Sequence, residues 1–257
     1  MPKAPSTASS IDVSFLGTGD AFASGGRLQS GYLLTANNYR VLMEAGPTVL
    51  PALKRSRIPP EDIDLILISH LHGDHFGGLP FLILNYLWEN PPSKPITIAG
   101  PKHLEERTWR LFRTMFPNSG ADAERVRRQL RFVVLEPGDN RRLGRIRVAA
   151  IRTPHMRREA SLALKLTFDG KTIVFSGDSG WTEDLVAFAA GADLFMCECT
   201  YFESSHLDFH MNYPELQRQR SRFDVGRMIL THVGREVLGH QHELNIETAS
   251  DGMTLQV

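Results

Sequence analysis

The segment 69–78, SHLHGDHFGG, carries an unusual density of side chains that bind metal ions. Three of the chain's 10 histidines and one aspartate fall within six residues, as His70, His72, Asp74 and His75. Imidazole and carboxylate groups are the usual ligands of zinc and related divalent ions. His70 and His72 lie two residues apart in a predicted turn and can point the same way. Asp74 and His75 can then address a second ion, and the glycines let the backbone fold tightly around both.

Three later residues share one context, a polar side chain directly after an apolar run and flanked by Gly, Pro or Thr. His155 follows residues 146–151, Asp178 follows residues 172–176 and His232 follows residues 227–230. Taken alone, a residue in this context is more often an ordinary loop residue than a metal ligand. The context that all three share strengthens the prediction that they are ligands. We therefore expect these three side chains to complete a site with the first cluster.

The elements that position these loops alternate along the whole chain. Residues 79–88 have the length and apolar density of a buried helix, and Asp169-Gly170 predicts a hairpin turn. The pattern predicts two sheets covered by helices, with functional loops along one edge. We expect residues 1–10 to be a disordered tail and residues 11–257 to form a single domain. The predicted strands are 11–16, 31–35, 39–44, 61–69, 96–99, 131–135, 146–151, 161–168, 172–176, 193–197 and 227–231, and the predicted helices are 79–88, 104–116, 183–190 and 213–223.

Composition excludes several classes of protein. With 257 residues, 42% hydrophobic and 23% charged, the chain is neither disordered nor collagenous nor a disulfide scaffold. Its longest apolar stretches, 63–68 and 79–88, are far shorter than the ~20 residues needed to cross a bilayer. Residues 1–10 lack the apolar core of a secretory signal. Cys197 and Cys199 fit reduced thiols, so we expect a cytoplasmic location with no membrane partner.

Charge is balanced overall but uneven along the chain. Residues 102–158 carry 15 Lys and Arg against 6 Asp and Glu, whereas residues 159–257 carry 7 against 15. The basic segment could form a patch that attracts phosphate-bearing substrates. Alternatively, its arginines pair with the acidic C-terminal part.

The order His-x-His-x-Asp-His, a separate His, a Gly-Asp and a Thr-His resembles the metallo-β-lactamase superfamily of metallohydrolases. The opening FLGTG, at residues 15–19, extends the resemblance over nearly the whole chain. The resemblance implies a four-layer αββα sandwich with the metal site along one edge of the two sheets. It also implies two divalent ions, zinc foremost, with manganese or iron compatible. His70, His72 and His155 would hold the first ion, Asp74, His75 and His232 would hold the second, and Asp178 would bridge both.

Two such ions would lower the pKa of a shared water and supply a bridging hydroxide near neutral pH. Asp74 could also orient this nucleophile or accept its proton. The leaving group then needs a general acid. His206 and His210, in the loop before the last predicted helix, are the candidates for this role, and exposed loop histidines are the alternative interpretation.

The opening, together with Arg27 and the ending LTH at residues 230–232, is most similar to the ribonuclease Z-like branch, whose members cleave phosphodiesters. That branch often carries His-Glu-Ala-Thr where this chain has CECT, at residues 197–200. The histidine of that motif is missing here, so the role of general acid moves to His206 or His210. Its tRNA-processing members insert a long arm between the third metal-binding His and the Gly-Asp. Only 22 residues separate His155 from Asp178, so we do not expect tRNA as the substrate. The sequence favours a phosphodiesterase for a small or nucleotide phosphodiester, such as a cyclic nucleotide.

The sequence leaves several other functions and residue roles open. A lactone, thioester or sulfate-ester hydrolase of the same superfamily would use an identical metal site. A metal-binding protein without catalysis and a nucleic-acid-binding module are further alternatives, and the last predicts affinity that falls steeply with salt. Cys197 and Cys199 face the same side of a strand, which favours core packing over an extra metal site or an active-site role. The resemblance also implies a homodimer as one assembly state.

Overall fold

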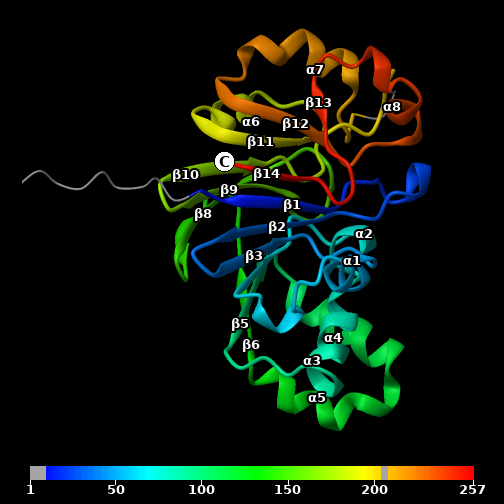
Figure 1. Cartoon of the computed structure of the whole chain (residues 1–257), viewed down its shortest axis with the longest axis vertical. Coiled ribbons are helices and arrows are strands. Elements are labelled where there is room, and N and C mark those ends of the chain that lie inside the picture. The colour runs from blue at the N-terminus through cyan, green and yellow to red at the C-terminus, as the bar shows by residue number, and fades with distance from the viewer. Residues whose placement is uncertain (1–9, 204–207) are drawn as a thin grey trace, which may run out of the picture.

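Two mixed sheets of seven strands each pack face to face at the centre of the molecule (Figure 1). The computed structural model describes residues 10–203 and 208–257, so the expectations for residues 1–9 and for His206 lie outside the described residues. Helices cover the outer face of each sheet, above and below the strands in Figure 1. This arrangement confirms the predicted four-layer αββα sandwich. Across the described ranges, no helix combines the length and apolar character that spanning a membrane requires.

The first sheet is formed by the N-terminal part of the chain and completed by the last strand. The predicted strand 61–69 is shorter than expected, because Pro60 begins a 3₁₀ turn and has no N–H to donate to a sheet. The strand order is β14 (Thr254–Gln256), β1 (Asp12–Gly17), β2 (Gly31–Ala36), β3 (Tyr39–Met43), β4 (Leu65–Leu67), β5 (Ile96–Gly100) and β6 (Leu130–Val134). Its helices are α1 (Val49–Arg55), α2 (Gly73–Phe76), α3 (Leu79–Trp88), α4 (Leu104–Met115) and α5 (Gly120–Arg127).

The second sheet follows in the chain. Asp169 and Gly170 both have positive φ and join β9 to β10 in the predicted hairpin. These two strands use most of the residues between His155 and Asp178, so the long arm is absent as expected. The strand order is β13 (Glu247–Thr248), β12 (Val225–Thr231), β11 (Ala192–Glu198), β10 (Lys171–Phe175), β9 (Leu162–Phe168), β8 (Ile146–Arg152) and β7 (Asn140–Leu143). Its helices are α6 (Glu183–Ala189), α7 (Tyr213–Gln219) and α8 (Arg235–Gly239).

The core between the sheets is apolar and aromatic. Tyr32 of the first sheet and Phe175 of the second are fully buried, with ring centroids 5.2 Å apart. The Tyr32 hydroxyl lies 2.9 Å from Oγ1 of Thr231 and so ties the sheets together directly before His232. Parallel pairing of β3 to β6 and of β10 to β12 brings their carboxyl ends to one edge. The ligand-bearing loops leave the sheets at this edge.

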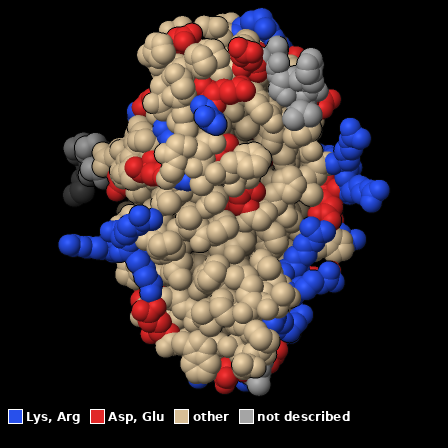
Figure 2. All heavy atoms as spheres, turned by 90° about the vertical axis from the view of Figure 1, so that its right-hand side faces the viewer, with Lys and Arg blue, Asp and Glu red and all other residues tan. Residues whose placement is uncertain are grey.

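The basic segment 102–158 pairs with the acidic C-terminal part only in part. Within the described residues, two arginines of the segment form ion pairs with that part, Arg107 with Glu159 and Arg145 with Asp169. Arg127 pairs locally instead, with acidic residues of the same segment. In Figure 2, Lys and Arg side chains lie mainly along the borders of the visible face, and its middle is largely uncharged. Positive charge is therefore left at the surface.

Candidate metal centre

Four loops at one edge of the sandwich bring all seven predicted ligands together. One loop follows β4 and contains the one-turn helix α2, and the others follow β8, β10 and β12. The ligand atoms form two groups, and within each group every pair lies within 4.8 Å. The first group is His70, His72, His155 and Asp178, and the second is Asp74, His75, Asp178 and His232.

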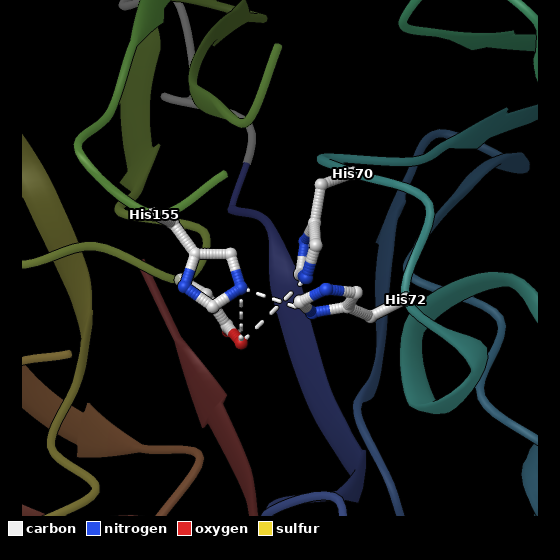
Figure 3. A group of neighbouring side chains, drawn as sticks. His70, His72 and His155 are labelled. Atoms are coloured by element: carbon white, nitrogen blue, oxygen red, sulfur yellow. Dashed lines mark hydrogen bonds and ion pairs between the residues drawn. The ribbon is translucent and has the colours of Figure 1, made fainter. Parts of the chain in front are cut away.

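The first group is a triangle of imidazole rings beside one carboxylate. Figure 3 shows His70, His72 and His155 with their rings turned toward one another. Nε2 of His155 lies 3.0 Å from Nδ1 of His72, and Nε2 of His70 lies 3.7 Å from Oδ2 of Asp178. The Nδ1 atom of His155 is 2.8 Å from the carbonyl oxygen of Phe209 and donates its proton there, which leaves a lone pair on Nε2. Burial lowers the pKa of His70 well below its usual range, so this ring is neutral, as a metal ligand must be.

The second group shares Asp178 with the first. Oδ1 of Asp178 is 3.3 Å from Nε2 of His75, and Oδ2 is 3.5 Å from Nε2 of His232. Oδ2 of Asp74 lies 3.2 Å from the same His75 atom. Burial raises the pKa of the Asp178 carboxyl, but the imidazoles of His232, His75 and His70 outweigh burial and hold this pKa well below its usual range. Asp178 is therefore an ionised carboxylate between both groups.

One glycine makes the position of Asp178 possible. Gly177 has a φ of +58°, in the left-handed region that favours glycine. A Cβ atom there would lie 2.4 Å from the carbonyl oxygen of Leu162 and 3.2 Å from Cβ of Ser69. The loop after β10 can therefore pass close to the loop after β4 only with glycine at this position.

Among the described residues, three buried ligand atoms make no hydrogen bond and contact only other members of the two groups. Nε2 of His70, Nε2 of His75 and Oδ1 of Asp178 are buried and make no hydrogen bond with any described residue. Leaving such an atom unsatisfied costs ~1–3 kcal/mol. A divalent cation would satisfy nitrogen and carboxylate oxygen atoms together, and it prefers this donor set. The residues present therefore fit metal ions in both groups.

The sequence interpretation missed the role of Glu44, which follows β3. Its Oε2 lies 3.2 Å from Nδ1 of His75, and its Oε1 accepts a hydrogen bond of 2.9 Å from the backbone N–H of Ser69. Its side chain is fully buried. The contact orients the His75 ring so that Nε2 faces the second group. The signal in the sequence is one carboxylate at the end of an apolar strand, which alone does not reveal the partner.

A second carboxylate–imidazole pair stands beside the two groups. Nδ1 of His210 lies 2.7 Å from Oε1 of Glu198, the glutamate of the Cys-Glu-Cys segment. The hydroxyl of Thr200 donates to Oε2 of Glu198 at 2.9 Å. Burial lowers the pKa of His210, but the Glu198 carboxylate outweighs burial and raises this pKa to about 9. His210 lines a cavity of about 510 Å³ with His72 and His155, whereas His206 lies outside the described residues.

The two cysteines take no part in these groups. Both side chains are fully buried in the core between the second sheet and its helices. Burial raises the pKa of each thiol well above its ordinary value. Neither thiol belongs to a metal-binding group among the described residues. Core packing, the favoured interpretation of Cys197 and Cys199, is the one that agrees with this structure.

Comparison with known proteins finds three similar proteins and one family model, each over nearly the whole chain. Ribonuclease Z of Clostridium novyi is 24% identical, over 87% of this chain and 89% of its own length. The metallo-beta-lactamase fold protein YhfI of Bacillus subtilis superposes with a TM-score of 0.77 at 22% identity, covering 95% of this chain and 99% of YhfI. The short form of human tRNase Z gives a TM-score of 0.75 at 27% identity, over 95% and 98%. A family model described as "Anti-Pycsar protein Apyc1" matches residues 11–249.

Proposed function

The chain belongs to the family of the anti-Pycsar protein Apyc1, and on this premise we propose that it is a dinuclear metal-dependent phosphodiesterase. Its substrate in this proposal is a small or nucleotide phosphodiester, such as a cyclic nucleotide. The observation that carries the proposal is the convergence of seven ligand side chains in two groups that share Asp178. The metallo-β-lactamase fold and the ribonuclease Z relative support the choice of a phosphodiester. The short segment between His155 and Asp178 in this chain, which leaves no room for a long arm, supports the choice of a small one.

The proposed ions are two divalent cations, with zinc first and manganese or iron also compatible with the donor set. When bound, they would polarise the phosphate and lower the pKa of a water molecule, so that hydroxide is available near neutral pH. His70, His72 and His155 would hold one ion, Asp74, His75 and His232 would hold the other, and Asp178 would be shared by both.

The carboxylate of Asp74 has two tasks in this proposal. Burial raises its pKa, but His75 and His232 outweigh burial, so the group is ionised at neutral pH. Its side chain is 10% exposed, unlike the fully buried ring of His75. Asp74 can therefore accept a hydrogen bond from the nucleophile and orient it while also acting as a ligand.

His210 is the proposed general acid. Its Nδ1 atom is engaged by Glu198, so Nε2 is the ring nitrogen that can give a proton to the leaving oxygen. Glu198 stabilises the protonated ring, and Thr200 fixes the glutamate in turn. The cavity that His210 shares with His72 and His155 brings the acid beside the proposed metal ligands.

The test is hydrolysis of bis-p-nitrophenyl phosphate by protein reconstituted with zinc or manganese. We expect turnover that is lost in Asp178→Ala, because that variant removes the ligand common to both groups. A phenyl ester, a lactone, a thioester and a sulfate ester are run in parallel. Turnover of one of these without diester turnover would replace the proposal with another hydrolase of the superfamily. Bound metal with no turnover of any substrate would instead indicate a metal-binding protein without catalysis.

A further inference from the structure

We infer that Thr200 is a positioning residue, whose hydroxyl orients the His232 ring toward the second proposed ion and ties this ring to the general acid His210; the inference deepens the proposed phosphodiesterase function and rests on it. Thr200 follows β11 and His232 follows β12, two neighbouring parallel strands in which Glu198 is paired with Thr231. Parallel strands end at the same edge of a sheet, so the fold brings the two side chains together. Oγ1 of Thr200 lies 3.1 Å from Nδ1 of His232.

The direction of the hydrogen bonds at Thr200 follows from the position of the His232 ring. Its Nε2 lies 3.3 Å from Oδ2 of Asp74 and 3.5 Å from Oδ2 of Asp178, within the second group. A ring nitrogen that binds a metal ion needs its lone pair, so the proton of the neutral ring is on Nδ1 and is donated to Thr200. The Thr200 hydroxyl donates its own proton to Oε2 of Glu198 at 2.9 Å, because this charged acceptor is nearer than the carbonyl oxygen of His232 at 3.3 Å.

Glu198 extends this contact to two further parts of the site. Its side chain is fully buried. Its Oε1 accepts hydrogen bonds from Nδ1 of His210 at 2.7 Å and from the backbone N–H of Ser179 at 2.8 Å. Its Oε2 accepts the hydroxyl and the backbone N–H of Thr200. One carboxylate therefore holds the loop of the proposed shared ligand, the general acid and, through Thr200, the ring of His232.

The backbone of His232 requires support from its surroundings. Its φ is +50°, in the left-handed region that residues other than glycine rarely adopt. Such a conformation persists only where neighbouring contacts impose it, and it is concentrated at functional sites. The loop after β11 lies directly against this segment, because a Cβ atom at Gly234 would be 2.2 Å from the carbonyl oxygen of Thr200. Thr200 therefore contacts the His232 segment through both its backbone and its hydroxyl.

Zinc binding by the full chain tests this inference without turnover. Thr200→Val removes the hydroxyl at nearly constant volume, whereas Thr200→Ser keeps the hydroxyl. In competition with a chelator, we expect Thr200→Val to lower the affinity for one of the two ions about tenfold, as loss of a group behind a metal ligand does. Thr200→Ser should restore most of this loss. In a His232→Ala background, Thr200→Val should leave the affinity for the remaining ion unchanged, because the ring that Thr200 orients is gone.

The matched control is Thr108→Val on α4. Thr108 is also buried, and its hydroxyl has no hydrogen-bond partner among the described residues. We expect this variant to bind zinc as the wild-type protein does. If Thr200→Val does not fold, Thr200→Cys gives the same comparison, because a thiol is a much weaker hydrogen-bonding group.

The link from Thr200 to His210 has its own measurement. At saturating zinc, kcat/KM of Thr200→Val should fall about threefold more for thymidylyl-thymidine, whose leaving group is an alkoxide, than for bis-p-nitrophenyl phosphate, as one neutral hydrogen bond allows. Equal losses on both substrates would overturn this link.

Three zinc-binding results would overturn the positioning role: wild-type zinc affinity in Thr200→Val, no rescue by Thr200→Ser, or an equal loss for both ions. The expected change in zinc affinity in a protein that does not hydrolyse bis-p-nitrophenyl phosphate would count against the phosphodiesterase and leave the positioning role of Thr200 standing.

Discussion

Glu198 and His210 form a 2.7 Å contact that links the end of β11 to the loop before α7. The sequence separates the two residues by 12 positions, and the fold brings them together beside the metal ligands. The carboxylate accepts the Nδ1–H and favours the protonated ring. A protonated imidazole facing a substrate cavity can supply the proton that an alkoxide leaving group requires.

The variant His210→Gln should lose activity in proportion to the basicity of the leaving group. For thymidylyl-thymidine, whose leaving group is an alkoxide, we expect kcat/KM to fall by ~100-fold or more. For bis-p-nitrophenyl phosphate the loss should be much smaller, because nitrophenolate leaves without a proton. The Glu198→Gln variant should show the same selectivity in weaker form. Equal losses on both substrates would contradict the role of His210 as the acid.

Removal of Asp178 should change metal content as well as activity. Elemental analysis of the wild-type protein should find about two zinc ions per chain, as a two-metal hydrolase requires. The Asp178→Ala variant should hold about one or fewer, because each proposed ion loses a ligand. Asp193→Ala serves as the control, since this partly exposed carboxylate pairs with Lys171 away from the site. Full zinc occupancy in Asp178→Ala would refute the bridging position.

Loss of the Glu44 carboxylate should weaken the binding of one proposed ion more than the binding of the other. Glu44 contacts His75, a proposed ligand of the second ion only. We expect Glu44→Gln to lower the affinity of that ion ~10–100-fold, as losses of groups behind a metal ligand do. Titration with a competing chelator should then resolve a weak and a tight phase. An equal loss of affinity for both ions would show that Glu44 supports the whole edge of the fold and not the His75 ring in particular.

The thiols of Cys197 and Cys199 should react slowly in the native protein. Burial raises both pKa values, so less thiolate is present at pH 8 than in a free cysteine, and thiolate is the reactive form. Labelling with a disulfide reagent should be slow in buffer and rapid for both thiols in denaturant. The Cys197→Ala/Cys199→Ala variant should keep its zinc content and activity. A loss of zinc there would revive an additional cysteine metal site.

Much of the fold follows from local patterns. The helix α3 has the predicted bounds, because its apolar density and the Asn-Pro-Pro sequence after it act within a few residues. The hairpin at Asp169 and Gly170 was equally predictable, because positive φ restricts the residue types that suit it. The short strands β7, β13 and β14 were missed. They lie at sheet edges, and pairing with β8, β12 and β1, respectively, stabilises them more than their own residue composition does.

The sequence by itself determined the residue types of the site and the order in which they occur. Four of the proposed ligands share one segment, and each of the others stands after an apolar strand, so their chemistry could be predicted from spacing. Only the tertiary structure decided the partners: Glu44 with His75, Glu198 with His210, and Thr200 with His232. The physical reason is that hydrogen bonds and charge contacts depend on distance in space. That distance is set by how the loops pack together at the edge of the two sheets.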